Sequence, residues 1–367
     1  MVHKTVIIGN GGHAGSWRRE INKHPEFELV GIVDTQTEMM EHMNVFGLSE
    51  EDFFISIDDY VDDRGKPDVA VIAAPIYTHH VLVKETMDHG INVICEKNMA
   101  SNIIQGKQMV QSALDHPELV TAVGHQYRYW HRNWLAKCFY QEHNDLGDLA
   151  FIRWSSSGNW GERRSGWRRW LQDVYAEDMG PHHWDLLRYI TGLNVVQVKA
   201  DTFIPNYSWW QGSSTVFANM ALAHPDDYNH RHNWIWVQYY GDWQARGPQH
   251  ESRNHMDMYF GKGHVRIGGS WLEIDRYLDE EGKKSEEDGF LVMDAGNDGV
   301  EHMGTNYEGQ AIILEQVHRG IQSGGKKKPL NCFENIFKSF AISMGVIESS
   351  RTGKNVWVPD YWADMPI

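Results

Sequence analysis

Apolar and polar residues follow two different rhythms along this chain. Up to residue 125, short apolar runs alternate with stretches of helical periodicity. The strand-like runs are residues 4–8, 27–33, 53–55, 68–74, 92–96 and 120–124, and the clearest helical stretches are 79–89 and 103–115. Strands that alternate with helices form parallel sheets with right-handed crossovers. The pattern therefore predicts an α/β domain over residues 1–125.

After residue 125 the rhythm changes. A helical stretch at 131–143 is followed by strand-like runs at 149–156, 195–203, 215–222, 234–240 and 256–267. Several of these runs follow one another without a helix between them, which predicts a mostly antiparallel sheet. A helix that starts at Pro181, a favoured first helical position, and ends before Gly192 interrupts them.

The end of the chain has helical periodicity again. We expect helices over 309–323 and 332–352, and the charged segment 278–288 has the composition of a solvated loop. Residues 126–367 are thus predicted to form an α+β domain for substrate binding and oligomerisation, with a large open sheet. The pattern leaves open whether the C-terminal helices pack back on the first domain.

The first apolar run stops at a glycine-rich turn before a helix begins. Gly9 permits the tight turn, Gly11 allows the backbone to approach a pyrophosphate, and Ala14 keeps helix and strand close. Gly12 and His13 complete the turn. The first N–H groups of the helix then face the phosphates. This is the arrangement of a dinucleotide-binding site.

The second apolar run ends in Asp34, at the position expected for the acid that binds the adenosine ribose. A carboxylate accepts hydrogen bonds from both ribose hydroxyls and repels a 2′-phosphate. No arginine follows in residues 35–37 to neutralise such a phosphate. The predicted cofactor is therefore NAD rather than NADP.

Composition narrows the classes of partner and compartment. The 367 residues carry a formal charge of −16, which argues against nucleic acid or an anionic membrane as a partner. The three cysteines have no metal-ligand spacing, and no apolar run reaches the ~20 residues that span a bilayer. With no signal-like start, we expect a cytoplasmic protein. Five histidines, His224, His230, His232, His250 and His255, lie in polar segments without ligand spacing, so no metal site is predicted.

The chain has 16 tryptophans, an unusual number. Some stand beside arginine and asparagine, as Trp160 and Trp167 do. Two interpretations remain open for this feature. The tryptophans either build a large aromatic core, or they offer flat faces to a sugar ring whose hydroxyls bind the polar neighbours.

Several motifs together resemble one enzyme family. They are the glycine turn with Asp34, residues 74–79 followed by Glu96-Lys97, residues 124–128, residues 178–185, and the tail 349–356. This ordered set is similar to the glucose–fructose oxidoreductase/inositol dehydrogenase/rhizopine catabolism family. The resemblance implies a Rossmann domain followed by a domain whose open sheet makes homo-oligomer contacts.

The resemblance also implies roles for individual residues. Lys97 would hydrogen-bond the reacting hydroxyl, Glu96 would orient Lys97 or the nicotinamide ribose, and His182 would act as the general base. Asp178 would bind substrate or hold the imidazole. From their positions alone, Asp185, three residues after His182, could help to orient the site, and we interpret His183 as a packing residue beside it. The cofactor would also contact Ala74, Pro75, His79 and Gln126, and the substrate would contact Arg128, Tyr175, Trp160 and Trp167.

The chain departs from the family pattern in two places. The family has a proline after Glu-Lys, often with a cis bond, where this chain has Asn98; the backbone path at Lys97 therefore stays open. A glycine pair before the Asp–His motif is replaced by Tyr175-Ala176-Glu177. These larger side chains indicate a narrowed pocket and a specialised substrate.

The leading hypothesis is an NAD-dependent oxidoreductase that oxidises a secondary hydroxyl of a sugar or glycoside, such as C3 of a glucoside. One alternative is NAD-assisted glycoside cleavage by oxidation and elimination, for which Tyr175 and Glu177 are acid/base candidates. An inositol or free-sugar dehydrogenase is another. A non-catalytic NAD-linked sensor is disfavoured because Lys97, Asp178 and His182 are all present.

Overall fold

The computed structural model describes residues 2–159, 166–245, 254–268, 271–278, 283–294 and 308–367. The chain divides into two compact units. The first contains residues 1–126, residues 307–340 and the last residue, and the second contains residues 127–306 and 341–366. Part of the C-terminal helical segment therefore belongs to the first unit.

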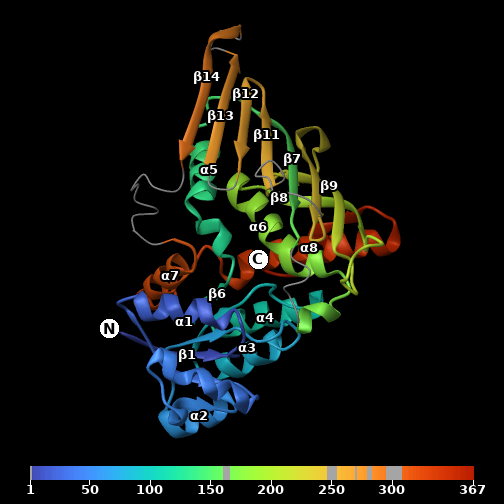
Figure 1. The fold of residues 1–367 in the computed structure, drawn as a ribbon. Helices are drawn as coiled ribbons and strands as arrows, with labels where there is room; N and C mark the ends of the chain where they lie inside the picture. Colours follow the sequence, from blue (N-terminus) through green and yellow to red (C-terminus); the bar gives the residue numbers. More distant parts are fainter. Residues whose placement is uncertain (1, 160–165, 246–253, 269–270, 279–282, 295–307) are drawn as a thin grey trace. The chain divides into compact units, whose positions relative to one another are not determined.

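A six-stranded parallel sheet forms the centre of the first unit (Figure 1). Its strands are β1 (His3–Ile8), β2 (Phe27–Val33), β3 (Phe53–Phe54), β4 (Val69–Ile72), β5 (Asn92–Cys95) and β6 (Thr121–Val123). Their order is β3-β2-β1-β4-β5-β6, the doubly wound order of a Rossmann fold. Ligands bind such sheets outside the carboxyl ends of the strands where the order reverses, here between β1 and β4. The glycine turn after β1 lies at that edge.

Helices with one apolar side cover this sheet. They are α1 (Ala14–Lys23), α2 (Ile57–Arg64), α3 (His79–Asp88), α4 (Ile103–Asp115), α7 (Gln310–Gln322) and the first part of α8 (Phe333–Thr352). α1 buries Trp17 and Ile21, and α7 buries Ile313 and Val317, all four with no exposed surface. Each buried side chain of this size contributes about 1.5–3 kcal/mol. The spacing of these residues explains why both segments are helices.

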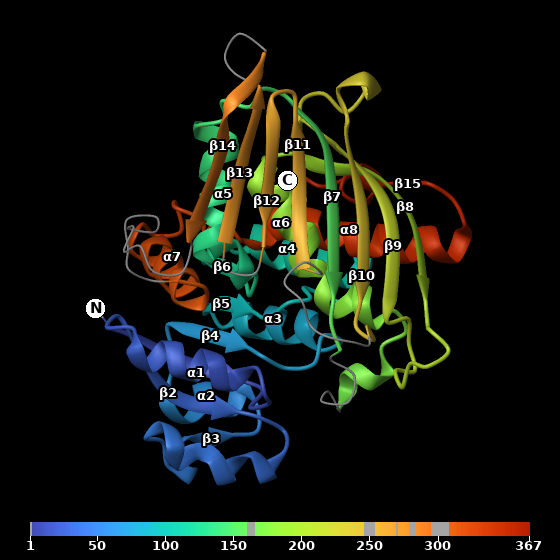
Figure 2. The ribbon, with the colours of Figure 1, turned by 45° about the horizontal axis from the view of Figure 1, so that its top comes forward.

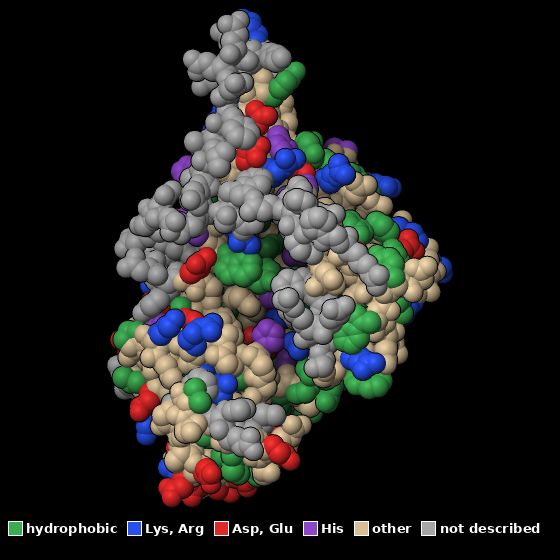
Figure 3. Space-filling model, in the orientation of Figure 1, with side chains coloured by type: hydrophobic (Ala, Val, Ile, Leu, Met, Phe, Trp, Pro, Cys, Tyr) green, Lys and Arg blue, Asp and Glu red, His purple; other side chains and the backbone are tan. Residues whose placement is uncertain are grey.

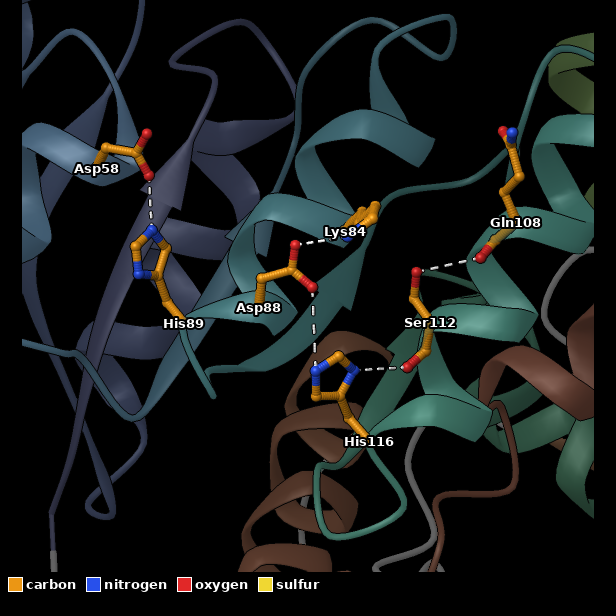
Figure 4. A network of polar contacts seen from close by, with 7 residues as sticks. All are labelled: Asp58, Lys84, Asp88, His89, Gln108, Ser112 and His116. Atoms are coloured by element: carbon orange, nitrogen blue, oxygen red, sulfur yellow. Dashed lines mark hydrogen bonds and ion pairs between the residues drawn. The ribbon is translucent and has the colours of Figure 1, made fainter.

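Polar contacts join helix ends on the surface of the first unit (Figure 4). His89, just after α3, places Nε2 2.6 Å from a carboxylate oxygen of Asp58 on α2. Asp88 accepts a hydrogen bond from Lys84 Nζ at 2.6 Å, and its other oxygen lies 4.0 Å from His116 Nε2 at the end of α4. Exposed pairs of this kind contribute about 0–1 kcal/mol. We interpret this network as a set of surface contacts that connect α2, α3 and α4, and not as a reactive site.

A nine-stranded sheet dominates the second unit. Its strands are β7 (Leu149–Ser157), β8 (Asn194–Phe203), β9 (Thr215–Ala223), β10 (Ile235–Asp242), β11 (Asn254–Phe260), β12 (Gly263–Ile267), β13 (Trp271–Leu278), β14 (Lys284–Asp294) and β15 (Val356–Trp357). The order is β14-β13-β12-β11-β7-β10-β9-β8-β15, and only β7 and β10 pair in parallel among these described strands. The predicted fold class, a Rossmann domain plus a domain with a mostly antiparallel sheet, is confirmed.

The two faces of this sheet differ in solvent exposure. α5 (His131–Glu142) and α6 (Gly180–Thr191) lie on one face (Figure 2). Ile152 and Trp154 of β7 are buried, whereas Arg153 between them is exposed, as alternation along a strand requires. Phe217 and Tyr259 are exposed by 49% and 37%. This exposed aromatic surface is the one for which oligomer contacts are predicted.

Two expectations for this sheet were wrong. Residues 256–267 form the hairpin β11–β12 rather than one strand, with Tyr259 opposite His264. Gly263 starts β12 and allows β13 to approach closely, because a Cβ there would lie 2.2 Å from the carbonyl oxygen of Asp275. The second error concerns segment 278–288, in which residues from Lys284 onward form β14 instead of a loop, while 279–282 lie outside the described residues. β14 is an edge strand, where charged residues are common because they discourage further strand pairing.

Acidic side chains gather at the end of the first unit where α2 lies (Figure 3). This segment contains Glu50, Glu51 and Asp52 and, within α2, Asp58, Asp59, Asp62 and Asp63. Such a surface repels polyanions. No helix in the described parts of the chain has the length and apolar character needed to cross a membrane.

Candidate functional site

The glycine turn after β1 has the geometry that a dinucleotide requires. Gly9 has φ +91°, and a Cβ at this position would lie 2.8 Å from the backbone nitrogen of Ala74. No side chain fits there without moving the end of β4. Above Gly11 and Gly12, in contrast, an added Cβ would meet no atom within 4 Å. The turn therefore packs tightly against the sheet on one side and is open on the other.

α1 begins directly behind this open turn. Its first residue, Ala14, is fully buried, and Ala14 N donates a hydrogen bond to Gly11 O at 3.0 Å. His13 precedes the helix and makes no side-chain cap. The first N–H groups of a helix have no partner within the helix and bind phosphate oxygens readily. Residues 9–14 thus fit the pyrophosphate of NAD.

Asp34 follows β2 and is held by backbone groups. One carboxylate oxygen accepts a hydrogen bond from Asn10 N at 2.7 Å, and the other accepts one from Gln36 N at 2.9 Å. The Asn10 side chain in turn accepts a hydrogen bond from Arg18 at 2.7 Å. A carboxylate has about four acceptor positions, so Asp34 keeps capacity for ribose hydroxyls. Its position beside the glycine turn fits the predicted role.

Glu96 and Lys97 follow β5 and are 4% and 5% exposed. Glu96 Oε1 accepts a hydrogen bond from the indole of Trp17 at 2.7 Å, and Oε2 accepts one from Lys97 N at 3.1 Å. The Glu96 carboxylate is therefore anchored by α1 and the next peptide. The Lys97–Asn98 peptide bond, whose geometry the sequence left open, is cis. Trp17 is a contact that sequence reasoning did not find.

His79 was expected to contact the cofactor. In the structure its ring lies between the backbone that follows β4 and the backbone that follows β5. Its Nε2 lies 3.0 Å from Ala74 O, and its Nδ1 lies 3.0 Å from Asn98 O and 3.2 Å from Met99 O. The ring has no exposed surface, and burial lowers the pKa of His79. His79 thus connects the Ala74-Pro75 loop to the peptides that follow Lys97. A cofactor contact stays a prediction.

Gln126 ends the first unit just after β6. Its side-chain oxygen Oε1 is buried and finds no hydrogen-bond partner within the described part of the chain. A buried acceptor without a partner costs about 1–3 kcal/mol, and a bound ligand with an N–H or O–H group would satisfy it. This supports the predicted cofactor contact of Gln126.

In the second unit, Asp178 and His182 lie on either side of a change in helix type. Residues Tyr175–Met179 form a π-helical turn, and α6 starts at Gly180. Both side chains are buried, with 2% and 4% exposure. Asp178 accepts a hydrogen bond from Arg168 Nε at 2.9 Å. Single turns of π-helix are frequent at functional sites.

His182 is held in an aromatic stack. Its ring lies parallel to that of Tyr127, with centroids 3.9 Å apart and planes inclined by 9°. The ring of Trp130 also stacks on Tyr127, with centroids 3.7 Å apart. Stacked rings fix the plane of the imidazole. Sequence reasoning included Tyr127 in a family motif but gave it no role.

Arg128 and Asp185 form a buried ion pair. Arg128 Nε and Nη2 each lie 2.6 Å from an oxygen of Asp185. The two residues are 3% and 1% exposed. A bidentate ion pair of this kind gives Arg128 a structural role. It also means that Asp185 binds a partner other than the His182 imidazole. Substrate contact by Arg128 remains a prediction.

Tyr175 and His183 belong to a chain of buried hydroxyls. Tyr175 Oη lies 2.8 Å from Tyr239 Oη, which lies 2.6 Å from His183 Nδ1. Tyr175 has no exposed surface, and burial raises its pKa. Burial, together with the charge of Arg132, lowers the pKa of His183 to about 3. Tyr175 was expected in the substrate pocket and His183 in packing; the structure places both in this internal chain.

The tryptophans divide between core and surface. Trp210 is 3% exposed and packs against Trp243 at 5.5 Å, so it belongs to the core. Trp167 is half-buried beneath the guanidinium of Arg168 at 4.6 Å. Trp160 lies outside the described residues. The core interpretation therefore applies to Trp210, whereas contact of Trp160 or Trp167 with a sugar ring stays a prediction.

A small hollow of about 100 Å³ lies in the second unit beside these groups. Tyr127, Arg132, Asn133, Trp154, Ser156 and His183 contribute to its wall. These residues come from the segment before α5, from α5 and α6, and from β7. This volume is smaller than the roughly 300 Å³ at which typical small-molecule sites begin. Through Tyr127 the hollow is one aromatic ring away from His182.

Several histidines of the polar segments lie beside acidic side chains. His255 and His264 lie 3.2 and 3.1 Å from the two carboxylate oxygens of Asp257, and His230 pairs with Asp227. Within the described ranges, no group of three or more His, Cys, Asp or Glu side chains has the arrangement of a metal site. His250 lies outside these ranges.

Comparison with known proteins gives this geometry a family. Residues 3–125 match the model of an oxidoreductase family with an NAD-binding Rossmann fold, GFO_IDH_MocA. The match covers the Rossmann part of the chain, from β1 to β6. The resemblance drawn from the motifs is confirmed, and so is NAD as the cofactor that the GFO_IDH_MocA domain binds.

Individual relatives extend over more of the chain. A 2,7-anhydro-N-acetylneuraminate hydratase from Mediterraneibacter gnavus is 25% identical over 231 residues, which is 61% of this chain and 57% of that protein. An oxidoreductase from Agrobacterium radiobacter, solved with NAD+, L-tartaric acid and magnesium, is 20% identical, with TM-score 0.80 over 98% of this chain and 99% of its own. A levoglucosan dehydrogenase in complex with NADH and levoglucosan is 18% identical, with TM-score 0.77 over 98% of this chain and all of its own. At these identities the structural matches establish the fold.

Proposed function

We propose that this protein is an NAD-dependent oxidoreductase that oxidises a secondary hydroxyl of a sugar or glycoside. The open glycine turn beside the backbone-held Asp34 carries the proposal, because it fits the pyrophosphate and the ribose of NAD. The second unit supplies a buried imidazole, His182, in a fixed plane. Relatives named as acting on, or solved with, carbohydrates support a sugar-type substrate.

In this mechanism His182 and Lys97 both act on the reacting hydroxyl of the substrate. NAD, when bound, supplies the acceptor for the hydride. The hydroxyl proton passes to the His182 imidazole, and the Lys97 ammonium donates a hydrogen bond to the same oxygen as negative charge develops on it. Glu96, held by Trp17, fixes the peptide that carries Lys97. Oxidation at C3 of a glucoside is the form of the reaction that we favour.

The second candidate is cleavage or rearrangement of a glycoside that begins with the same oxidation. The hydratase among the relatives favours it, since a hydratase adds water rather than leaving a keto-sugar as product. This route needs another acid or base. Burial raises the pKa of Glu177, whose carboxylate accepts a hydrogen bond from Asp173 N at 2.9 Å, so Glu177 is better suited than the fully buried Tyr175.

Single-turnover reduction of NAD, followed by absorbance with a panel of glycosides, tests the proposal. We expect His182→Ala to slow the reduction by about 10²–10⁴-fold and Lys97→Ala by about 10²–10³-fold. The double variant should be much less impaired than the product of the two effects, because both residues act on one oxygen. His232→Ala, which removes an exposed histidine of the second unit, is the matched control.

The products separate the two candidates. A loss of two hydrogens by mass spectrometry identifies a keto-sugar, and a released aglycone identifies cleavage. Unchanged NAD reduction in a folded, NAD-binding His182→Ala variant would refute the assigned base.

A further inference from the structure

Three segments of the first unit meet at the Glu96 carboxylate. Its Oε1 accepts a hydrogen bond from the indole N–H of Trp17 on α1 at 2.7 Å, and its Oε2 accepts one from the peptide N–H of Lys97 at 3.1 Å. The backbone after β6 lies against the same carboxylate, since a Cβ added to Gly124 would be 3.0 Å from Oε1. The side chains of Trp17, Glu96 and Lys97 are all buried. The carboxylate is therefore held by protein groups rather than by water.

The bond from Trp17 has the length of a charge-assisted hydrogen bond, which is about 2.7–2.9 Å. An indole has one N–H and no acceptor, so Trp17 is the donor and Glu96 the acceptor. Other buried tryptophans of this chain lack such a bond. Trp210 of the second unit is 3% exposed, and its Nε1 has no hydrogen-bond partner among the described residues. The contact with Glu96 is thus a specific property of Trp17.

Lys97 is held on its other side by a different element. His79, the first residue of α3, places Nδ1 3.0 Å from the carbonyl oxygen of Asn98. The peptide before Lys97 therefore depends on Trp17 through Glu96, and the peptide after it depends on His79. Loss of the Trp17 bond should release one side of Lys97 while the other side stays in place.

Trp17 belongs to the helix that fits the pyrophosphate of NAD. It lies three residues after Ala14, where α1 begins, and so in the first turn of that helix. A displacement of about 1 Å at a reacting group can slow a reaction about 10²-fold. A residue that fixes the backbone of Lys97 therefore affects the rate without contacting the substrate.

We propose that Trp17 is a positioning residue, which sets the place of Lys97 through the Glu96 carboxylate. The proposal rests on the function proposed above, in which Lys97 donates a hydrogen bond to the reacting oxygen. Trp17 has no exposed surface, so it acts only through its buried contacts. The helix that receives the pyrophosphate thereby also holds the lysine that acts on the substrate.

Two substitutions separate the hydrogen bond from the packing of the indole. In Trp17→His, Nε2 is as many bonds from Cβ as the indole Nε1, so an N–H donor is kept while the six-membered ring is lost. Trp17→Phe keeps a larger apolar ring and loses the donor. We expect Trp17→Phe to slow single-turnover reduction of NAD by about 10- to 100-fold and Trp17→His to be clearly faster than Trp17→Phe. Trp210→Phe, which removes a buried indole without a hydrogen bond, is the matched control and should leave the rate unchanged.

The Lys97→Ala background shows whether Trp17 acts through Lys97. Residues that act as a unit have non-additive effects, so Trp17→Phe should have almost no further effect on the rate once the ammonium is absent. A full additional loss in this background would show that Trp17→Phe damages the protein in another way, and would overturn the positioning role.

Hydrogen exchange measures the same contact without the reaction. The Lys97 peptide N–H should exchange about 10- to 100-fold faster in Trp17→Phe, the effect of a lost charge-assisted hydrogen bond, and should stay slow in Trp17→His and Trp210→Phe. Gly124→Ala displaces the same carboxylate from another segment and should also speed this exchange. It decides the question if the Trp17 variants do not fold.

Exchange and turnover together distinguish this proposal from the proposed function. Faster exchange at Lys97 in Trp17→Phe, in a protein that reduces NAD with none of the glycosides, would support the hold on Lys97 and refute the oxidoreductase reaction. Unchanged exchange in Trp17→Phe, or a Trp17→His variant that is slower than Trp17→Phe, would overturn the positioning role, whatever the protein oxidises.

Discussion

The Arg128–Asp185 pair allows a quantitative prediction, because both partners are almost fully buried. Asp185→Ala leaves a guanidinium without its counter-ion at a position with 3% exposure. Removing one partner of a buried ion pair costs about 3–5 kcal/mol. We therefore expect the free energy of unfolding of Asp185→Ala to fall by that amount.

A second pair in the same unit provides the control. Nε and Nη2 of Arg276 donate hydrogen bonds to the two carboxylate oxygens of Asp145, at 2.8 and 3.3 Å. The side chains of Arg276 and Asp145 are, however, 37% and 53% exposed. Asp145→Ala should cost only about 0–1 kcal/mol, because water screens the pair. The same residue types and the same kind of contact are thus compared at two levels of burial.

Urea titration followed by tryptophan fluorescence measures both variants, with NAD binding as a check that the first unit is intact. The double variant Arg128→Met/Asp185→Leu should recover most of the loss, since replacing a whole buried pair by apolar groups is often neutral. A loss below about 1 kcal/mol in Asp185→Ala would show that the pair is hydrated, and the reasoning would fail. A large rise in KM without loss of stability in Arg128→Met would instead favour substrate contact.

Three other properties are open to measurement. Asp34→Ala should weaken NAD binding by about 1.5–3 kcal/mol and reduce discrimination against NADP, as calorimetry with both cofactors would show; unchanged NAD affinity would contradict the ribose role. The pKa of His183 is about 3 in the folded protein and about 6.5 in the unfolded chain. As the pH is lowered, the unfolded chain is therefore protonated at His183 before the folded protein is. Stability should therefore decrease as pH drops below about 6.5, by up to about 1.4 kcal/mol per pH unit, and His183→Phe should flatten that slope in urea titrations. The exposed aromatic face around Phe217 and Tyr259 predicts a homo-oligomer, which a monomer in light scattering would contradict.

Features that depend on neighbouring residues could be predicted from the sequence. Gly9 and Asp34 follow β-branched runs, so the turn and the acid at the sheet edge could be inferred from local pattern. The change from alternating elements to consecutive strands located the second sheet for the same reason. The hairpin at 256–267 was missed because two adjoining strands and one long strand have the same alternation, and only Gly261 and Gly263 mark the turn.

Contacts between distant residues could not be predicted in this way. Trp17 and Glu96 are 79 positions apart, and Arg128 and Asp185 are 57 apart. Taken alone, each of these four residues is of a type that is common in any helix or at the end of any strand. Their partners follow from how helices pack on a sheet, which a single sequence does not specify. This is why Arg128 was assigned to substrate and Asp185 to the imidazole.

His182 and His183 show how this limit affects the interpretation of chemistry. The two histidines are adjacent in α6, so their side chains leave the helix about 100° apart. One stacks on Tyr127, and the other contacts Tyr239 of the sheet. The resemblance assigned catalysis to the first, and we interpreted the second as packing, because a motif specifies residue types and not what each ring contacts. The hydroxyl chain through Tyr239 and Tyr175 holds the second imidazole against the sheet. Two neighbouring residues of one motif thus have different surroundings, and these surroundings depend on distant parts of the chain.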